Sequence, residues 1–361
     1  IVKHLKPKPQ SANAGWGFAY GSFPDSFTLP VSEYIFTPGG LVMPELMKLL
    51  GDGAFHSGEA LGKAMGVSRS AVWKQLQQLE AKFGVSIQKI PGKGYRLSEQ
   101  IRLLDPVAID DGALGLKGIH LSETLDSTNA EALRLVSLGA SMPFLVLSEQ
   151  QTAGRGRRGR TWVSPFGTNL YYSLAIQLVR GASQLEGLSL VIGLAVLNAV
   201  KEFGVCSVGL KWPNDLLVGD NKLAGILLEL IGDPADICHV VIGIGINVNM
   251  SQDRAAIDRP WTSLQAETGI VQDRNLLVSR LNHHIADYLE RQREAGFASL
   301  AEEWRSADLW MGREVCLSSG AGEVVGISKG IDDKGGLRLL VDGVERIYSG
   351  GELSLRLRHD S

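Results

Sequence analysis

The spacing of apolar residues between positions 43 and 102 predicts three short helices followed by a hairpin. Leucines recur at helical spacing over 46–50, and Ser57 and Ser68 stand where the N-cap residues of a second and a third helix belong. All three helices end at a glycine, a common C-terminal signal. Two strand-like pieces within 86–97 are joined by a Pro-Gly-Lys-Gly turn. Helix, tight turn, helix and hairpin is the order of a winged helix-turn-helix domain.

The segment 105–308 alternates strand-like and helical patterns. Its apolar runs and its 3.6-residue periodicities imply a sheet with helices packed against it, although the order of the strands cannot be read from the pattern. The strand candidates are 144–148, 169–178, 222–230 and 240–248, and the helix candidates are 130–138, 185–203 and 275–294.

Beyond Trp310, short strands alternate with glycine-containing turns. Ser-Gly, Lys-Gly, Gly-Gly and Asp-Gly steps separate the strand candidates 314–317, 323–328, 337–341 and 344–348. This pattern is typical of a small all-β barrel of about 50 residues.

The first 42 residues have a composition of their own, with two Lys-Pro steps and many glycine, proline and serine residues. They show neither an Arg-rich amphipathic pattern nor an apolar core before a cleavage site. We therefore expect a poorly ordered extension, with Met43 as a candidate start. The predicted domains are 1–42, 43–102, 103–308 and 309–361.

Charge is distributed unevenly along the chain. The net charge of the 361 residues is −3, which argues against a protein that coats nucleic acid along its whole length. Residues 43–102, however, hold nine basic and five acidic residues, so the predicted helix-turn-helix carries +4. The side chains expected to contact DNA are Ser68, Arg69, Ser70, Trp73, Lys74 and Gln77 on the third helix and Lys93 in the wing. The alternative is a small helical domain with a solvated polar face, in which Trp73 can equally be a core residue.

Cysteine usage argues against a protein stabilised by disulfides or zinc, and hydropathy argues against a membrane-spanning helix. The three cysteines are isolated and form no CxxC pair, so neither a disulfide framework nor a zinc site is expected. A reducing, cytoplasmic location fits best. The longest apolar run, 188–200, is about 13 residues long, whereas a membrane helix needs roughly 20.

The segment 154–162 reads GRGRRGRTW and carries four arginines within six positions. Such a loop does not belong in a core, and its guanidinium groups are suited to bind an anion while the glycines allow close backbone approach. We expect it to become ordered around an anion, with Trp162 covering a flat ligand. A flexible loop that binds RNA nonspecifically is the alternative.

Four other segments carry polar groups in positions of interest. KWPND at 211–215 places Lys211, Asn214 and Asp215 at a strand end, because Pro213 interrupts the ladder. Lys222 begins the apolar run KLAGIL, and GIGIN at 243–247 has glycines that permit a close approach. Ser127, Thr128 and Asn129 precede a predicted helix, either as N-cap residues or as donors and acceptors for an uncharged polar group such as a urea. No dinucleotide fingerprint and no GxxxxGK[ST] phosphate loop occurs in the sequence.

Taken together, these segments resemble the biotin–protein ligase family in its bifunctional form, which also represses the biotin operon. The resemblance is carried by STN, GRGRRGR with Trp162, SPFGTNLY, KWPNDL, KLAGIL and GIGIN, in the family's order, and it covers about residues 44–358. It implies an α+β protein with a winged helix-turn-helix, a central α/β ligase domain with a mixed sheet, and an SH3-like C-terminal β-barrel.

The resemblance also implies roles for individual residues. The residues expected at biotin are Ser127, Thr128, Asn129, Gln151, Gly154, Arg155, Gly156, Arg157, Lys222, Gly225, Leu227 and Gly243. Those expected at the nucleotide are Arg157, Arg160, Trp162, Lys211, Asn214 and Asn247. ATP, biotin, and Mg²⁺ carried by the nucleotide are the expected small molecules; a biotin carboxyl-carrier domain, operator DNA and a second copy of the chain are the expected partners.

The expected reaction has two steps. The biotin carboxylate, already ionised at pH 7, attacks the α-phosphate of ATP, and a carrier lysine then attacks the biotinyl-adenylate. Arg155, Arg157 and Lys222 are expected to balance the phosphate charge, and Asp215 to orient the incoming amine. The alternatives are a lipoate or octanoate transferase of the same fold and a biotin-sensing DNA-binding protein without catalysis.

Overall fold

The computed structural model describes residues 43–111, 114–178, 185–232, 238–251, 257, 259–319, 322–349 and 353–358. The predicted extension 1–42 lies outside the described residues. No helix in the described part of the chain is both long and apolar enough to cross a membrane.

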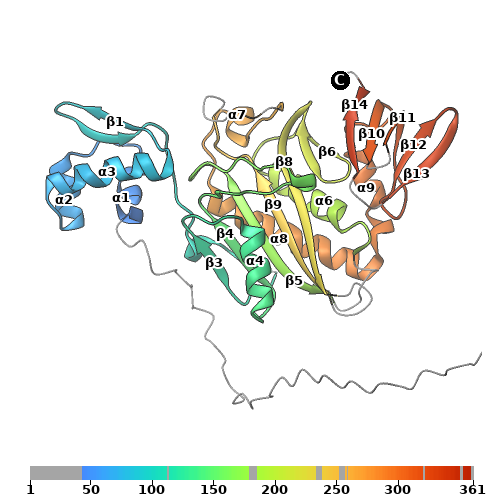
Figure 1. Ribbon diagram of the computed structural model, residues 1–361, viewed down its shortest axis with the longest axis horizontal. Coiled ribbons are helices and arrows are strands. Elements are labelled where there is room, and N and C mark those ends of the chain that lie inside the picture. The colour runs from blue at the N-terminus through green and yellow to red at the C-terminus, as the bar shows by residue number, and fades with distance from the viewer. Residues whose placement is uncertain are drawn as a thin grey trace, which may run out of the picture. The chain divides into compact units, whose positions relative to one another are not determined.

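The N-terminal part folds as its pattern predicts (Figure 1). It consists of α1 (Met43–Leu50), α2 (Gly58–Met65), α3 (Arg69–Phe83) and an antiparallel hairpin of β1 (Ile87–Ile90) and β2 (Gly94–Leu97). Ser57 Oγ accepts a hydrogen bond from the backbone of Ala60 (3.0 Å), and Ser68 Oγ accepts one from Ala71 (3.2 Å). Trp73 is 44% exposed, so it is a surface residue of α3 and not part of the core.

A seven-stranded mixed sheet forms the central part. Its strands are β3 (Ile119–Ser122), β4 (Phe144–Ser148), β5 (Leu170–Leu178), β6 (Val208–Lys211), β7 (Asp215–Val218), β8 (Asn221–Gly232) and β9 (Cys238–Ile246). They lie in the order β3-β4-β5-β9-β8-β7-β6, and only β3 and β4 run parallel. The short strands β3 and β7 were not among the predicted elements, whereas β6 is the strand whose end was predicted at Lys211.

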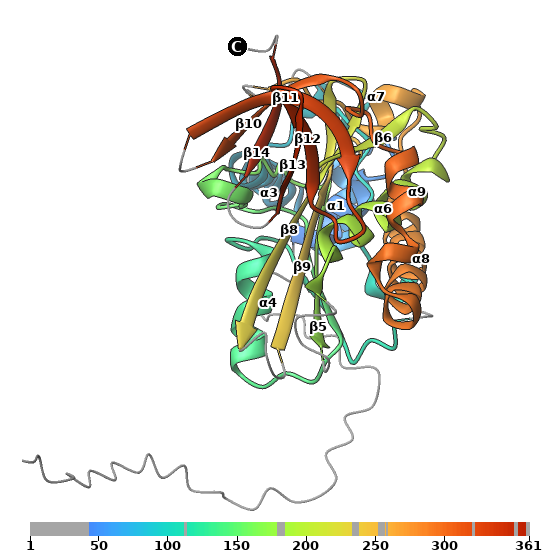
Figure 2. The same cartoon turned by 90° about the vertical axis from the view of Figure 1, so that its right-hand side faces the viewer.

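Helices cover both faces of this sheet (Figure 2). On one face lies α4 (Thr128–Ser137); on the other lie α6 (Leu188–Lys201) and α8 (Arg274–Ala295). Period-two alternation produces this layering, since Phe144 and Val146 of β4 pack with α4 while Leu145 and Leu147 join the larger core beneath α6. The other short helical elements of the described ranges are α7 (Leu264–Thr268), α9 (Ala301–Ser306) and the 3₁₀ turns Pro106–Ala108, Arg157–Gly159 and Phe297–Ser299.

Five antiparallel strands make up the C-terminal part. They are β10 (Glu314–Ser319), β11 (Gly322–Ile331), β12 (Leu337–Val341), β13 (Val344–Tyr348) and β14 (Ser354–Leu357), in the order β13-β12-β11-β10-β14. The predicted Asp-Gly turn is present, with φ of 51° at Asp342 and 78° at Gly343. β14 was missed, although the Ser-Gly and Gly-Gly steps at 349–351, which precede it, are turn signals of the same kind as the earlier ones.

Candidate active site

Two adjoining cavities lie where the polar segments of the central part meet. The first, of about 60 Å³, is bordered by the start of α4, the arginine-rich loop and the middle of β8 and β9. The second, of about 460 Å³, is bordered by the same loop, the β6–β7 turn, residues 257 and 259–261, and residues 353–355. Gly156, Arg157, Trp162, Asn214 and Lys222 line both cavities and therefore stand between them.

A hydrogen-bonded network fixes the polar end of the first cavity. Gln151 Oε1 accepts from the backbone N–H of Thr128 (2.8 Å) and lies 3.2 Å from its hydroxyl, while Gln151 Nε2 donates to Ser164 Oγ (2.9 Å). Ser164 in turn donates to the carbonyl of Trp162 (2.9 Å). Ser127 occupies the N-cap position of α4 but makes no capping hydrogen bond. The network therefore connects the start of α4 to the end of the arginine-rich loop.

Asn129 is held in one orientation from both sides. Its Oδ1 lies 2.6 Å from the buried hydroxyl of Ser173 on β5, and its Nδ2 donates to Glu229 Oε2 (2.8 Å) on β8. It also sits against Gly243, where an added Cβ would lie 2.2 Å from Asn129 Oδ1. Only glycine at this position leaves room for the amide.

Trp162 packs on the sheet through a second pair of glycines. Gly225 of β8 and Gly245 of β9 are directly paired, and an added Cβ at Gly245 would lie 2.5 Å from Trp162 Cε2. Lys222 Nζ lies 5.4 Å from the centroid of the indole ring. The indole N–H is buried and has no hydrogen-bond partner among the described residues. The close approach predicted at the glycines of GIGIN is thus made, at Gly245, by the indole ring of Trp162.

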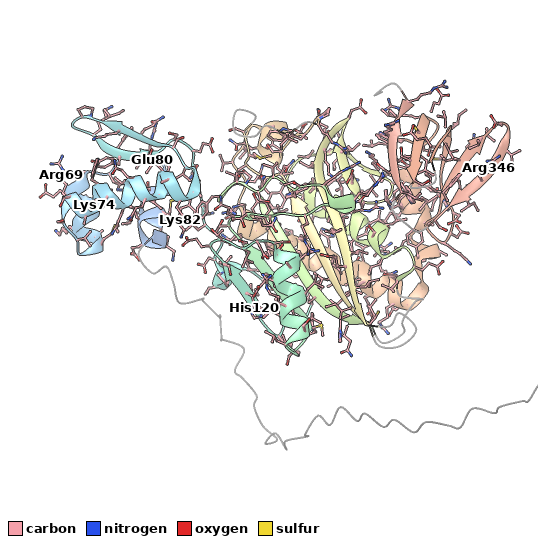
Figure 3. All side chains as sticks on the ribbon, viewed as in Figure 1. Arg69, Lys74, Glu80, Lys82, His120 and Arg346 are labelled. Carbon is pink, nitrogen blue, oxygen red and sulfur yellow. The ribbon has the colours of Figure 1, made fainter. Side chains whose placement is uncertain are left out.

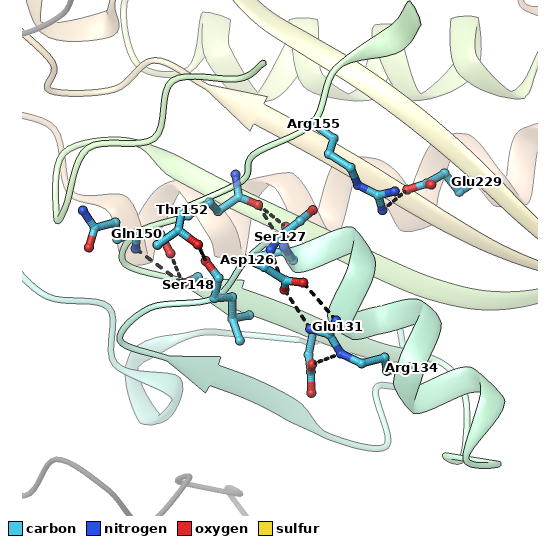
Figure 4. Close-up of polar contacts among 12 residues, drawn as sticks. Asp126, Ser127, Glu131, Arg134, Ser148, Gln150, Thr152, Arg155 and Glu229 are labelled. Atoms are coloured by element: carbon cyan, nitrogen blue, oxygen red, sulfur yellow. Dashed lines mark hydrogen bonds and ion pairs between the residues drawn. The ribbon is translucent and has the colours of Figure 1, made fainter. Parts of the chain in front are cut away.

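The arginine-rich loop is folded back on itself. The backbone N–H of Gly156 donates to the carbonyl of Arg160 (2.7 Å), and Arg158 adopts a left-handed conformation (φ 59°). Arg155 donates to Glu229 (2.9 Å), as Figure 4 shows, and Arg157 donates to Asn214 Oδ1 (3.0 Å) and to the carbonyl of Leu353 (3.2 Å). The loop therefore contacts β8, the β6–β7 turn and the C-terminal part.

A second ion pair lies just before α4. Figure 4 shows Arg134 hydrogen-bonded to Asp126, and this contact lowers the pKa of the Asp126 carboxyl to about 2.

Asp215 lies between two lysines at the β6–β7 turn. Its Oδ1 is 2.6 Å from Lys222 Nζ and its Oδ2 is 3.8 Å from Lys211 Nζ. Burial alone would raise the pKa of Asp215, but the two ammonium groups more than offset it and hold the pKa below 3.8. Burial lowers the pKa of Lys211, with Asp215 opposing the shift. Asp215 is thus a carboxylate at neutral pH, and it fixes both lysines.

The second cavity has a large excess of positive charge. Burial lowers the pKa of Arg160, and the nearby Arg259 lowers it further. Among the described residues that line this cavity, Asp215 is the one carboxylate, whereas six are cationic: Arg157, Arg158, Arg160, Lys211, Lys222 and Arg259. Such a surplus of fixed cations suits an anion with several negative oxygens.

Most residues predicted for the site do come together. All six residues predicted for the nucleotide line the second cavity, and those predicted for biotin line the first, with one difference. Gly154 does not line it; it lies behind, where an added Cβ would be 2.4 Å from the carbonyl of Trp162. The residues at the site to which the sequence-based reasoning gave no role are Arg158, Thr161, Val163, Tyr171, Tyr172, Ser173, Trp212, Pro213, Ile226, Glu229, Ile244, Gly245, Ile257, Arg259, Pro260, Trp261 and 353–355. Those that belong to the quoted segments, among them Arg158, Tyr171, Ile226 and Gly245, were within reach.

The seven residues predicted to contact DNA are all exposed. Ser68 caps α3, and Arg69 and Lys74, labelled in Figure 3, extend from that helix. Lys93 lies in the turn of the hairpin. Exposure leaves all of these side chains accessible to a partner.

Comparison with known proteins identifies the three parts. Residues 121–247 match the biotin/lipoate A/B protein ligase family, residues 45–96 match an HTH domain, and residues 311–356 match the biotin protein ligase C terminal domain. The chain is 43% identical to the bifunctional ligase/repressor BirA of Salmonella typhimurium, over 86% of this chain and 96% of that protein. It is 42% identical to the protein of the same name from Escherichia coli, with the same coverage. Among solved structures, a biotin protein ligase from Aquifex aeolicus in complex with biotin and ATP is 32% identical, with a TM-score of 0.59, over 66% of this chain and 98% of that one.

Fold and site together define a ligase joined to a helix-turn-helix domain. The chain belongs to the biotin–protein ligase family and is of its bifunctional ligase/repressor type. The predictions of the family, the α+β fold class and the enzyme class are thereby confirmed.

Proposed function

We propose that the first cavity holds biotin, that the second holds ATP, and that the biotin carboxylate attacks the α-phosphate at the boundary between them. The observation that carries this proposal is the set of shared lining residues, among them Arg157, Lys222 and Trp162. Two ligands that fill adjoining cavities have their reacting ends close together. Holding the carboxylate and the phosphate close and correctly oriented lowers the barrier of such a reaction substantially. The 60 Å³ of the first cavity is small for a ligand, so its lining side chains must move outward on binding.

The polar end of the first cavity suits the ureido group of biotin. Hydroxyls of Ser127 and Thr128 and amides of Asn129 and Gln151 offer donors and acceptors without net charge. Among the described residues, Arg155 is the cation at this end, and it already shares Glu229 with Asn129. A charged head group would be poorly matched there.

The cations between the cavities serve the first step. Two anions must approach each other, and negative charge develops on the phosphate oxygens as the carboxylate attacks. Arg157 and Lys222, which line both cavities, are proposed to neutralise it, with Asp215 keeping the Lys222 ammonium in place (2.6 Å). Arg155, which was expected to share this task, lines the first cavity alone and donates to Glu229. Mg²⁺ is proposed to arrive with the nucleotide, whose phosphate oxygens are ligands that this ion prefers.

In the second step a carrier lysine attacks the acyl carbon and AMP leaves. That amine must arrive uncharged, and Asp215 is proposed to accept a hydrogen bond from it and orient it. The carboxylate is suited to this task, because the pKa below 3.8 keeps it ionised at neutral pH. Three cations, Arg157, Arg160 and Lys211, are proposed to stabilise the negative charge of AMP as its bond to the acyl carbon breaks.

For the N-terminal part we propose operator binding through α3 and the hairpin. The support is the exposed basic face of α3 and the +4 charge of residues 43–102. Repression would use a homodimer that places two such domains on a palindrome, favoured by biotinyl-adenylate. The cytoplasm as location stays a prediction from the isolated cysteines.

The experiment is transfer of labelled biotin to a purified carrier domain, with and without ATP and Mg²⁺, in competition with lipoate. The expected result is ATP-dependent labelling that excess lipoate leaves unchanged. Lys222→Ala is the loss-of-function variant, and Lys201→Ala, on the exposed end of α6, is the matched control. Labelling by wild type without ATP, or labelling that lipoate abolishes, contradicts the proposal.

A further inference from the structure

The segment 307–309, which leads from the central part into the C-terminal part, runs along the edge strand β6. The backbone N–H of Leu210 donates to the carbonyl of Ala307 (2.8 Å), and that of Leu309 donates to the carbonyl of Leu210 (3.0 Å). Gly209 makes this approach possible, because an added Cβ there would lie 2.5 Å from Leu309 Cγ. The connection is therefore fixed beside Lys211, the last residue of β6.

This placement brings Trp310 against Lys211. The Lys211 Nζ lies 4.3 Å from the centroid of the indole ring, and the ring is 4% exposed. The Lys211 side chain itself is 18% exposed, so the contact is largely shielded from water. Cation–π attraction is strongest for tryptophan and grows as the pair is desolvated.

The ammonium of Lys211 depends on this ring because its carboxylate partner is shared. Asp215 lies 3.8 Å from Lys211 but 2.6 Å from Lys222. Its closer contact is thus committed to the other lysine. The face of Trp310 supplies the second attraction that keeps the Lys211 ammonium directed along the wall of the larger cavity.

Trp310 is held by its backbone, and its indole N–H has no partner in the part of the chain that the structure describes. Its main-chain N–H donates to Asp308 Oδ1 (3.0 Å), which fixes the turn. The indole Nε1, by contrast, is buried without a hydrogen-bond partner among the described residues. A buried orphan donor costs free energy, and phenylalanine would avoid that cost. The large π face is the property of tryptophan that the site uses.

We propose that Trp310 is a positioning residue, which acts through Lys211 on the bound nucleotide, and that Asp308 sets the turn which places it. This inference rests on the proposed function. It means that the connection between the central and the C-terminal parts affects ATP binding through Lys211.

The test measures biotinyl-adenylate formation at varied ATP and at varied biotin. Trp310→Leu is expected to raise KM for ATP about tenfold and to leave KM for biotin unchanged, whereas Trp310→Phe is expected to stay within about threefold of wild type. Met311→Leu, at the exposed neighbouring residue, is the matched control. Thermal unfolding of each variant shows whether it folds. If Trp310→Leu does not fold, ring-fluorinated tryptophan at position 310 keeps the shape and weakens the π face, and KM for ATP is expected to rise with each added fluorine.

A double-mutant cycle separates positioning from a structural role. In a Lys211→Met background, Trp310→Leu is expected to cause no further rise in KM for ATP, because its effect passes through the ammonium. An equal further rise, or an unchanged KM in the single variant, overturns the inference while the proposed function stands. A wild-type chain that makes no biotinyl-adenylate contradicts the proposed function itself.

Discussion

Replacing Gly245 by alanine tests the packing on which both cavities depend. The added methyl group would lie 2.5 Å from Trp162 Cε2, whereas ordinary van der Waals contact begins at 3.4 Å. The indole must therefore rise by about 0.9 Å from β8 and β9, since the opposing backbone is locked in the sheet through the Gly225–Gly245 pair. Overpacking of this kind costs about 1–3 kcal/mol of stability.

The substitution is expected to slow the reaction as well as to lower the stability. A displacement of about 1 Å in a group that positions a reactant can lower a rate about 100-fold. Trp162 borders both cavities, so the misplacement reaches the point where carboxylate and phosphate must meet. We expect Gly245→Ala to form biotinyl-adenylate about 100-fold more slowly in a single turnover, with the fold intact.

Gly118→Ala is the control for this prediction. Gly118 lies just before β3, and the nearest atom to an added Cβ is His120 Nε2 at 3.8 Å, an ordinary contact. This variant should match wild type in adenylate formation and in thermal unfolding. If Gly245→Ala also matches wild type in rate, the reasoning about Trp162 is refuted.

Three further predictions follow from single residues. Asp215→Asn should lower adenylate formation at least about tenfold, because Lys222 and Lys211 lose the charge that fixes them; unchanged steady-state kinetics would contradict this. Burial raises the pKa of Asp308 to about 6 from the ordinary 3.8, so the folded chain binds a proton more tightly than the unfolded chain and loses stability as the pH rises from about 4 to 6. Asp308→Asn should remove up to about 3 kcal/mol of that pH dependence, and parallel urea curves for variant and wild type across this range would refute it. Lys74→Ala should weaken binding to operator and to unrelated duplex alike and lower the slope of log K against log salt by about 1, as filter binding at several salt concentrations would show; a loss confined to the operator would point to base readout instead.

Local signals in the sequence were sufficient for much of the fold. Ser57 and Ser68 specify helix starts because each side chain bonds a backbone N–H three residues ahead, an interaction that needs no tertiary context. Long strands such as β5 and β9 are buried on both faces and read as apolar runs. By contrast, β6 and β7 have four residues each and are specified by their pairing in the sheet. The helix predicted from 185 begins at Leu188, because Gly187 adopts a left-handed conformation (φ 65°).

The site was predictable where its residues belong to compact segments, and not where the fold supplies them. Lys222 stood out because it begins an apolar run, and Asp215 stood out because Pro213 places it at a strand end. Glu229 was assigned no role within the strand candidate 222–230, yet β8 carries it to Arg155 and Asn129. Arg259 follows no pattern and joins the cation cluster only through the path of the chain between β9 and α7. Sequence spacing does not predict such long-range contacts, because strand order and register determine them.

The central claim is that a biotin carboxylate oxygen attacks the α-phosphorus of ATP at the boundary between the two cavities. Biotin labelled with ¹⁸O in its carboxylate tests this directly, by mass spectrometry of the nucleotide released after transfer to a carrier domain. The account predicts AMP that carries one ¹⁸O, because the attacking oxygen stays on phosphorus when the lysine takes the acyl group. Label in inorganic phosphate or pyrophosphate, or AMP without label, would contradict it.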